Sequence, residues 1–369
     1  MDQSKIRLAI VCGGRSTEHE VSVCSARNVY DAADKSKYHV SLIKIEKSGA
    51  WRLLRSAAEL QAAPGFERFA LAGSDESAAQ GANMLQTIAS SSLEQGIDVV
   101  FPLVHGAFGE DGCLQGLLRL LNIPFVGTNV LGSAVGMDKD VMKRLLNHAG
   151  IPTARFRVLT DLVSTSFDKL VQELGLPVFV KPSNAGSSVG ISKVTAREEF
   201  SHALRTAFQF DEKVLIEECI KGRELECGVL GNEKPEASLV GEVVVNDAFY
   251  SYEAKYVNEH GAALKIPAQI PDEVSEQVRA MAVETFKVLG CSGLARVDFF
   301  LCDDGRILLN EINTLPGFTN ISMFPLLWEA AGICYSELVD RLIELALQRH
   351  GRQQSLAYDI NQTTPLPEV

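Results

Sequence analysis

Zinc-site and export signals are missing from this sequence. Its eight cysteines include no Cys-x-x-Cys pair and have no histidine at zinc spacing nearby, which argues against the zinc sites that such spacings reveal. No apolar run approaches membrane-spanning length, and residues 1–7 lack the features of a signal peptide. We therefore predict a cytoplasmic protein, without a membrane partner, whose thiols are reduced and mostly buried.

Clusters of positive charge are also missing. The chain has 35 basic and 47 acidic residues, a formal net charge of −12 and no Lys/Arg-rich run. This balance argues against a nucleic-acid partner held by bulk electrostatics, although it is compatible with a local cationic pocket. Two common phosphate-binding patterns, G-x-x-x-x-G-K-[ST] and G-x-G-x-x-G, do not occur. A phosphate site in this chain needs a different pattern.

Alternating strand and helix signals open the chain. Short apolar runs at 6–12, 38–45 and 97–104 are predicted strands, and 21–33 and 114–121 are predicted helices. This alternation is typical of a doubly wound parallel sheet. A chain of 369 residues with 46% hydrophobic content should form two or three domains with real cores. Residues 55–96 have weak periodicity and are interpreted as a peripheral insertion.

The segment RVDFFLCDDGRILLNEINTLPGFT, which begins at Arg296, has two apolar runs around an Asp-Gly pair. This pattern is typical of a β-hairpin. With Asp304-Gly305 at the tip, facing residues have numbers that sum to 609, so Asp298 faces Glu311 and Arg296 faces Asn313. Facing residues lie about 4.5–5.5 Å apart at Cβ, where like charges repel. A bound cation would relieve that repulsion.

Two interpretations of this hairpin stay open on its residues alone. Two carboxylates and an amide oxygen, with no His or Cys nearby, form a hard oxygen set that suits Mg²⁺ held together with substrate phosphates. A hairpin whose polar face is simply solvated fits equally well. In either case the opposite face, with Val297, Phe299 and Ile312, is predicted to be ordinary core.

A loop of small residues is the second candidate site. Lys181 ends a predicted strand and precedes PSNAGSSVG at 182–190, where backbone N–H groups can turn toward an anion. Lys139 opens the helix predicted at 137–148, where the helix dipole disfavours a cation unless a phosphate binds. The alternatives are a mobile turn and an exposed lysine that is screened by the aspartates on either side.

Further polar residues follow predicted strands. Glu217, Glu218 and Glu224 lie at or after the end of a short strand, where a base and a ribose could bind, although a solvated strand end fits as well. His105 follows a buried-looking strand at the edge where α/β sheets tend to bind ligands. Glu18 precedes the first helix, where capping is the ordinary role of a carboxylate.

Residues 246–262 combine aromatic and charged residues without a clear period. We interpret them as a long loop, and such loops are often lids. Lys255 and Tyr256 are its most useful pair, because a cation that can reach a phosphate stands beside a phenol. An irregular edge hairpin with Tyr250 and Tyr252 packed on the domain is the alternative.

Seven motifs occur in one order across almost the entire chain: GGRSTEHEVS, HGAFGEDG, MDKDVMKRLL, FVKPSNAGSSVG, EAKY, RVDFF and NEINTLPGFT. With these motifs the chain resembles the ATP-grasp superfamily and, within it, the D-alanine:D-alanine ligase family. The resemblance implies an α/β fold with an N-terminal Rossmann-like substrate domain at 1–135. Two α+β ATP-grasp units would follow, a central one at 136–225 and a C-terminal one with the lid and metal site at 226–369.

The resemblance also implies how ATP and metal are bound. Two Mg²⁺ ions, with Mn²⁺ as a substitute, would lie between the last two domains with ATP. Their ligands would be Asp298, Glu311 and Asn313, with Glu311 shared. The residues that would contact ATP are Lys139, Lys181, Gly186, Ser187, Ser188, Glu217, Glu218, Ile220, Glu224 and Lys255.

The substrate residues follow from the same resemblance. Glu18 would hold the ammonium of a first D-alanine and be linked through Ser187 to Tyr256 of the lid, with His105 near that substrate. An oxyanion would be stabilised by Arg296 and the backbone N–H of Gly317. The carboxylate of a second D-alanine would bind Ser322.

The implied reaction joins two D-alanines, with ATP cleaved to ADP and phosphate through an acyl phosphate, for peptidoglycan synthesis by a homodimer. Lys255 followed by Tyr256 resembles peptide-forming rather than depsipeptide-forming relatives. Asn184-Ala185 and Leu315 depart from some relatives, which leaves fine loop geometry open. The rival interpretations are a carboxylate-amine ligase for another amino acid and a silent nucleotide-binding regulator; the complete acidic set and the loop lysines oppose the latter.

Overall fold

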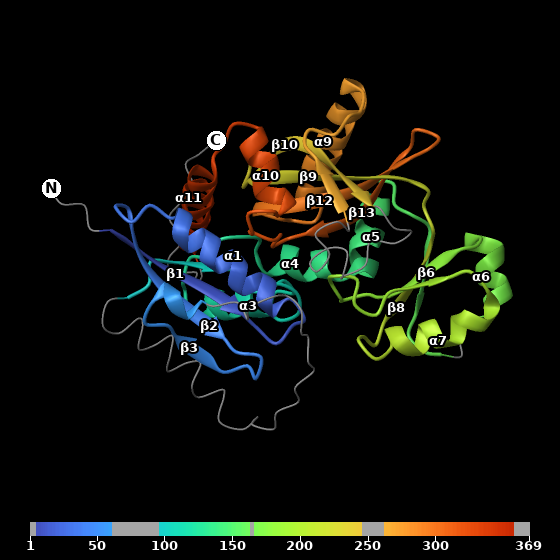
Figure 1. The fold of residues 1–369 in the computed structure, drawn as a ribbon, viewed down its shortest axis with the longest axis horizontal. Coiled ribbons are helices and arrows are strands. Elements are labelled where there is room, and N and C mark those ends of the chain that lie inside the picture. Colours follow the sequence, from blue (N-terminus) through green and yellow to red (C-terminus); the bar gives the residue numbers. More distant parts are fainter. Residues whose placement is uncertain (1–4, 61–95, 163–165, 246–261, 358–369) are drawn as a thin grey trace.

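The computed structural model describes residues 5–60, 96–162, 166–245 and 262–357. Most of the predicted insertion, and the predicted lid with Lys255 and Tyr256, lie outside these residues. The described chain forms three sheets, which occupy three consecutive stretches of the sequence and lie apart in Figure 1. The domain boundaries at 135 and 225 stay predictions, because sheet membership alone does not define them.

The first sheet has the order β3-β2-β1-β4. Strands β1 (Ile6–Gly13), β2 (Tyr38–Ile45) and β4 (Val99–Pro102) are parallel, and the short β3 (Trp51–Leu53) is antiparallel to β2. Alternate residues of β1 face opposite sides, so that Leu8 and Ile10 pack with α1 (His19–Ala32). Ala9 and Val11 pack with α3 (Cys113–Leu120) on the other side. The predicted doubly wound arrangement is therefore confirmed.

The second sheet is entirely antiparallel, with the order β5-β8-β6-β7. Its strands are β5 (Phe156–Leu159), β6 (Val178–Pro182), β7 (Ser192–Val194) and β8 (Val214–Glu218). Helices α6 (Phe167–Leu174) and α7 (Arg197–Ala207) contribute Leu170 and Phe200 to its core. The 182–190 loop therefore connects two neighbouring strands of one sheet.

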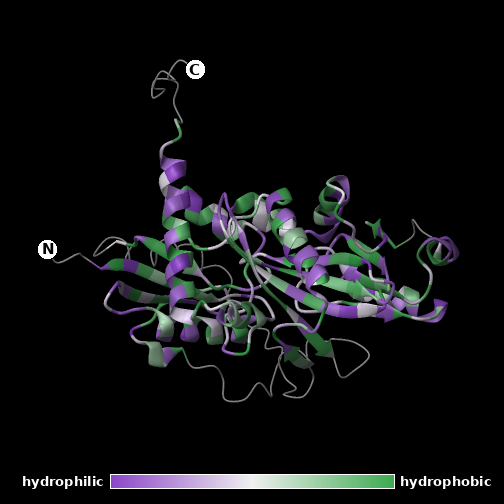
Figure 2. Cartoon of the chain, turned by 90° about the horizontal axis from the view of Figure 1, so that it is seen from above, coloured by the Kyte–Doolittle hydropathy of each residue, from purple (hydrophilic) through white to green (hydrophobic). Residues whose placement is uncertain are grey.

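The third sheet is also antiparallel, with the order β11-β10-β9-β12-β13. Its strands are β9 (Gly222–Gly231), β10 (Glu236–Val245), β11 (Ala262–Lys265), β12 (Gly293–Cys302) and β13 (Ile307–Asn313). Helix α9 (Asp272–Val288) packs into the core of this sheet, and α10 (Met323–Ala330) contacts β9 and β10. Figure 2 shows hydrophobic residues concentrated on the strands, whereas the helices carry both kinds of residue.

Helices α4 (Val130–Met137) and α5 (Lys139–His148) connect the first sheet to the second. The sequence predicts one helix over 137–148, but the side chain of Asp138 accepts a hydrogen bond from the N–H of Val141 and caps α5. Lys139 is therefore the first residue of its helix, as predicted. The preceding residue, Asp138, ends α4 and caps the start of α5.

The C-terminal helix α11 (Tyr335–Gln354) packs into the N-terminal core. Its Leu338 and Leu342 belong to the same buried cluster as Leu8 and Val29, and Figure 1 shows it beside α1. The buried guanidinium of Arg349 donates hydrogen bonds to backbone oxygens of the 125–127 segment. The sequence pattern predicts a helix over 336–349, but it does not predict this position, because amphipathicity does not specify which segment the helix packs against.

The hairpin of β12 and β13 corrects one detail of the prediction. The turn spans three residues, Asp303 to Gly305, with Gly305 at φ +85°, so the predicted two-residue turn is wrong. Pairing near the tip is shifted by one, as in Leu301 opposite Ile307, and a bulge after Asp298 restores the predicted register. Asp298 therefore faces Glu311 as expected. Val297, Phe299 and Ile312 are all buried, which confirms the predicted core face.

All eight cysteines are free, as predicted, but only four of them are buried: Cys12, Cys227, Cys291 and Cys302. Within the described residues, no helix is both long enough and apolar enough to cross a membrane.

Candidate active site

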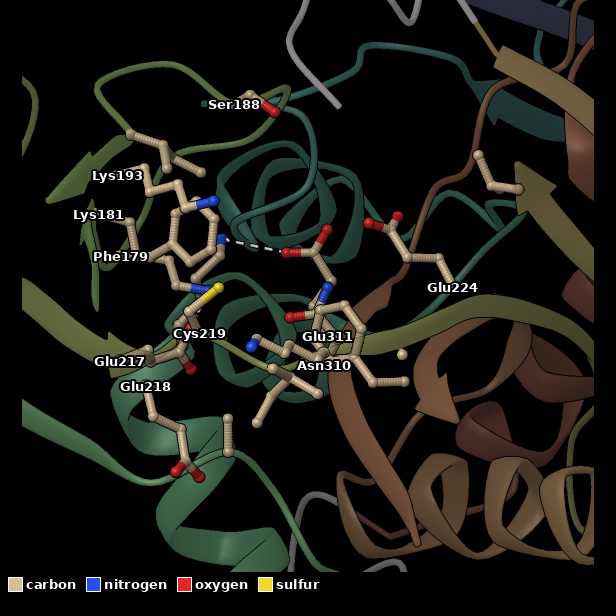
Figure 3. A pocket seen from close by; sticks show the side chains of 18 of the residues that line it. Phe179, Lys181, Ser188, Lys193, Glu217, Glu218, Cys219, Glu224, Asn310 and Glu311 are labelled. Carbon is tan, nitrogen blue, oxygen red and sulfur yellow. Dashed lines mark ion pairs between the residues drawn. The ribbon is translucent and has the colours of Figure 1, made fainter. Parts of the chain in front are cut away.

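A cavity of about 560 Å³ lies between the second and third sheets. This volume is in the range of small-molecule sites. Figure 3 shows charged side chains that point into it from both sheets. Every predicted ATP-binding residue that the structure describes lines this cavity: Lys139, Lys181, Gly186, Ser187, Ser188, Glu217, Glu218, Ile220 and Glu224. Sequence reasoning missed Phe179 and Lys193, which also line it, because no local pattern distinguishes them.

A second cavity of about 130 Å³ adjoins the first. The two share Gly186, Ser187, Val243 and Glu311 as lining residues, so the glycine-serine loop, the hairpin and β10 separate them. The predicted substrate and oxyanion residues that the structure describes all line the smaller cavity: Glu18, His105, Ser187, Arg296, Gly317 and Ser322. Residues from four segments that are distant in the sequence therefore line one small cavity.

Of the three metal candidates, Glu311 lines both cavities and Asn313 lines the smaller one, whereas Asp298 lines neither. Asp298 accepts hydrogen bonds from Nε and Nη2 of Arg296, each 2.8 Å long, and one of 2.9 Å from Nδ2 of Asn313. The Glu311 carboxylate lies 3.6 Å from Nζ of Lys139, the ion pair that is dashed in Figure 3. The facing carboxylates thus already attract positive charge, which fits a site for a hard cation.

The composition of this site limits its ligands. Among the described residues, no group of three or more His, Cys, Asp or Glu side chains could hold a metal ion. A metal at the hairpin would therefore need the amide of Asn313, or a bound phosphate, besides Asp298 and Glu311. That mixture of oxygen donors and substrate phosphates is typical of Mg²⁺, so the residues fit the predicted ion.

Lys139 has an unusual position for a lysine. It is only 7% exposed, and its Nζ lies 2.7 Å from the carbonyl oxygen of Ala185 in the loop. The alternative of an exposed lysine screened by its neighbours is therefore wrong. Asp138 and Asp140 instead pair with Lys213. An ammonium held at a helix N-terminus beside the loop is placed to bind an anion.

The 182–190 loop is held in a strained conformation. Ser187 and Ser188 have φ values of 49° and 60°, a region that costs a non-glycine residue about 1–3 kcal/mol. The hydroxyl of Ser187 donates a hydrogen bond to Oε1 of Glu18. Glu18 makes no side-chain capping bond to α1, so the capping alternative is wrong. Its carboxylate instead connects the first helix to the loop.

His105 has both ring nitrogens engaged. Nδ1 lies 3.0 Å from the carbonyl oxygen of Leu315, and Nε2 lies 3.1 Å from Oγ of Ser25. The N–H of Phe318 donates to that same Oγ, so the Ser25 hydroxyl can give its proton to Nε2 of a neutral ring. Burial lowers the pKa of His105 to about 4. His105 therefore ties the first sheet to the segment that follows β13.

This network predicts a pH dependence of stability. The unfolded chain, with an ordinary histidine pKa near 6.5, binds more protons than the folded chain down to about pH 4. His105 therefore stabilises the fold above pH 6.5, and about 3 kcal/mol of that is lost as the pH falls toward 4. We expect the stability difference between the unmodified protein and His105→Gln to shrink by that amount, measured by urea unfolding at pH 7 and pH 4.5.

The exposed His202 on α7 supplies the control, since His202→Gln removes a histidine without a buried network. A difference for His105→Gln that stays constant with pH would show that His105 is not held neutral.

Two carboxylates of the smaller cavity were not assigned from the sequence. Glu110 accepts a 2.7 Å hydrogen bond from the N–H of Gly106, and burial together with the charge of Glu18 raises the pKa of Glu110 well above its usual value. Glu226 on β9 faces Asp298 and lies 2.8 Å from Nε of Arg296. The only sequence signal for Glu226 was its position in a strand, since alternate residues of β9 face the site.

Comparisons with known proteins agree with this geometry. Residues 7–128 match the family model described as D-ala D-ala ligase N-terminus, and residues 145–344 match D-ala D-ala ligase C-terminus. The D-alanine–D-alanine ligase A of Chromobacterium violaceum is 52% identical over 359 residues, which cover 96% of this chain and 98% of the relative. The corresponding protein of Escherichia coli K12 is 50% identical over 358 residues, covering 95% and 98%.

Solved structures give the same result for the fold. The D-alanine–D-alanine ligase of Coxiella burnetii has a TM-score of 0.79 at 38% identity and covers 95% of this chain and 96% of its own. The VanG D-Ala:D-Ser ligase of Enterococcus faecalis has a TM-score of 0.78 at 32% identity, covering 93% and 100%. A Bacillus anthracis D-alanine–D-alanine ligase complexed with ATP scores 0.72 at 30% identity, covering 94% and 99%. The fold is thus the ATP-grasp fold of these enzymes, and the chain belongs to the D-alanine–D-alanine ligase family.

Proposed function

We propose that this protein joins two D-alanines to D-alanyl-D-alanine at the expense of ATP. The observation that carries the proposal is the pair of adjoining cavities, one large enough for a nucleotide and one small, with Ser187 and Glu311 in both linings. A phosphoryl group can therefore pass between occupants of the two cavities without crossing solvent. The product would serve as a precursor of peptidoglycan in the cytoplasm.

The first step would be phosphoryl transfer. A carboxylate oxygen of the first D-alanine attacks the γ-phosphorus of ATP, the bond to the β-phosphate oxygen breaks, and ADP leaves. Both reactants are anions, so neutralisation is the main task. Lys139 and Lys181 at the cavity wall would bind the phosphates. Two Mg²⁺ ions, or Mn²⁺, held by Asp298, Glu311 and Asn313 would add positive charge on the transferred group when bound.

The second step would form the peptide bond. The amine of the second D-alanine attacks the carbonyl carbon of the acyl phosphate, a proton is lost, and phosphate leaves. Arg296 and the N–H of Gly317 line the smaller cavity and are proposed to stabilise the oxyanion. Glu18 would hold the first ammonium and Ser322 the second carboxylate. Lys255 and Tyr256 of the lid are proposed to close over the site and exclude water.

A direct assay separates this proposal from its rivals. We expect phosphate release from ATP that depends on D-alanine, and no stimulation by L-alanine. D-serine and D-lactate are added in parallel together with D-alanine, because one structural neighbour is a D-Ala:D-Ser ligase. Equal release with L-alanine would remove the D-specific assignment. A mixed product with D-serine that exceeds D-alanyl-D-alanine would reassign the second substrate, and nucleotide binding without turnover would indicate a regulator.

We also propose a homodimer formed largely through the N-terminal domain. The supporting observation is the exposure of leucines on that side of the molecule, with Leu120 at 88% on α3 and Leu131 at 65% on α4. Exposed leucines gain free energy when a partner covers them. Light scattering that gives the mass of a single chain would reject the dimer.

A further inference from the structure

Lys143 is a buried cation that the proposed mechanism does not use. It lies one helical turn after Lys139 on α5, and its exposed fraction is 0%. Its Nζ is 2.5 Å from Oε1 of Glu217, and the ring of Phe156 lies 5.8 Å from the same nitrogen. Lys143 lines neither cavity. A fully buried lysine is expensive unless its charge has a purpose or a partner.

The partner of Lys143 is shared. Glu217 is 4% exposed, and its second carboxylate oxygen, Oε2, forms an ion pair with Lys181. Lys181 does line the larger cavity, where Figure 3 shows it beside Glu217. Burial by itself raises the pKa of Glu217, but the two ammonium groups outweigh it and lower that pKa. One ionised carboxylate therefore lies between a lysine that faces the cavity and a lysine behind it.

The net charge of these three side chains contributes to the electrostatic potential that a ligand in the cavity experiences. Glu217 and Lys181 alone would sum to zero, and a carboxylate that fixed Lys181 would also cancel its charge. With Lys143 the three groups sum to +1. Charge interactions at such a site are much stronger than in water because little solvent screens them. The positive charge of Lys143 thus offsets the negative charge that Glu217 brings when it holds Lys181.

We propose that Lys143 is a positioning residue for the nucleotide phosphates: it shares the carboxylate of Glu217, so that Glu217 fixes Lys181 at the cavity wall while these three groups together keep a net positive charge. This inference rests on the proposed ATP site. It assigns to the carboxylate of Glu217 the function of holding Lys181 and Lys143.

The test is a double-mutant cycle. Lys143→Met keeps most of the length of the side chain and removes its charge. We expect KM for ATP and Kd for Mg·ADP to rise roughly tenfold, with kcat changed less, because the net charge of the three groups falls from +1 to zero. Adding Glu217→Gln to Lys143→Met removes the carboxylate that is no longer balanced and should recover most of that loss. An interaction of this kind appears as non-additivity in the cycle.

Two control variants distinguish a failure of the proposed sharing of Glu217 from a failure of the proposed ATP site. Lys213→Met removes ion pairs to Asp138 and Asp140 near the same helix without touching Glu217, and it should leave KM for ATP within about twofold. Lys181→Met should raise KM strongly; no effect there would reject the ATP site itself. A normal KM in Lys143→Met, or a double variant worse than either single one, would overturn the sharing of Glu217 alone.

A loss of stability does not leave the inference untested. Kd for Mg·ADP is measured by calorimetry at a temperature at which circular dichroism shows the variant to be folded, because a reversible unfolding equilibrium would raise the apparent Kd. If Lys143→Met does not fold, the double variant replaces both buried charges and is compared with Glu217→Gln alone. Both retain the cation of Lys181 and they differ by the single charge of Lys143, so we expect the double variant to bind more weakly by at most about tenfold. A difference above tenfold would overturn the inference.

Discussion

Replacing Glu311 with glutamine, or Asp298 with asparagine, is expected to lower the rate of ATP-dependent product formation by about a thousandfold or more. Glu311 lines both cavities, and it faces Asp298 across the hairpin. Each amide keeps the shape of the side chain but removes the negative charge that a divalent cation requires. The loss should appear in kcat at saturating ATP, and raised Mg²⁺ should restore part of it.

The same hairpin provides a matched control. Asp304 at its tip is exposed and forms an ion pair with the exposed Arg306. Asp304→Asn changes the charge of the chain by the same amount, so it should leave turnover within about twofold. If either Asp298→Asn or Glu311→Gln retained activity near that of the control, with the protein folded by circular dichroism, the metal site would have to lie elsewhere.

Replacing Arg296 with lysine is expected to lower kcat by about a hundredfold or more while KM for ATP changes little. The guanidinium contacts both oxygens of Asp298 and one oxygen of Glu226, each at 2.8 Å. One lysine ammonium cannot reproduce that planar set of donors. Arg296 lines the smaller cavity but not the larger one, so the change should affect acyl transfer and not nucleotide affinity.

Arg306→Lys is the control for this substitution, because Arg306 is exposed at the tip of the same hairpin. The experiment compares steady-state kcat, KM for ATP and KM for D-alanine in both variants. A kcat for Arg296→Lys within about threefold of the control would remove Arg296 from the oxyanion site. A parallel rise in KM for ATP would instead indicate that Arg296 organises the metal ligands through Asp298.

The hairpin shows why sequence reasoning reached the site and missed details. Alternation of apolar and polar residues decides which side chains share a face, because a one-residue slip would expose Val297 and bury the carboxylates. The turn was less well determined, since Asp303, Asp304 and Gly305 permit both a two-residue and a three-residue loop. The three-residue turn shifts the pairing by one residue, and a bulge after Asp298 cancels that shift. The register at the carboxylates was therefore predicted correctly from an incorrect turn.

Other errors came from side chains whose partners are remote in the chain. Glu18 was expected to cap a helix, but its carboxylate binds Ser187, and Lys139 was compatible with an exposed position, but it is buried against the loop. Glu110, Glu226 and Lys143 were given no role from the sequence. A local sequence window cannot contain a contact between strands of different sheets.

The sequence by itself determined part of the fold and the kind of chemistry. Period and glycine position indicated β1, β2, β4, the hairpin, the first helix and the 182–190 loop, while facing carboxylates and small residues indicated a site for phosphates and a hard cation. Strands β3, β5, β7 and β11 were not predicted. Only the tertiary structure decided that the loop and the hairpin form the walls between two cavities, that α11 completes the N-terminal core, and that Glu217 lies between Lys143 and Lys181. The physical reason is that local preferences depend on neighbouring residues, whereas burial and ion pairing depend on whichever segments the folded chain brings together.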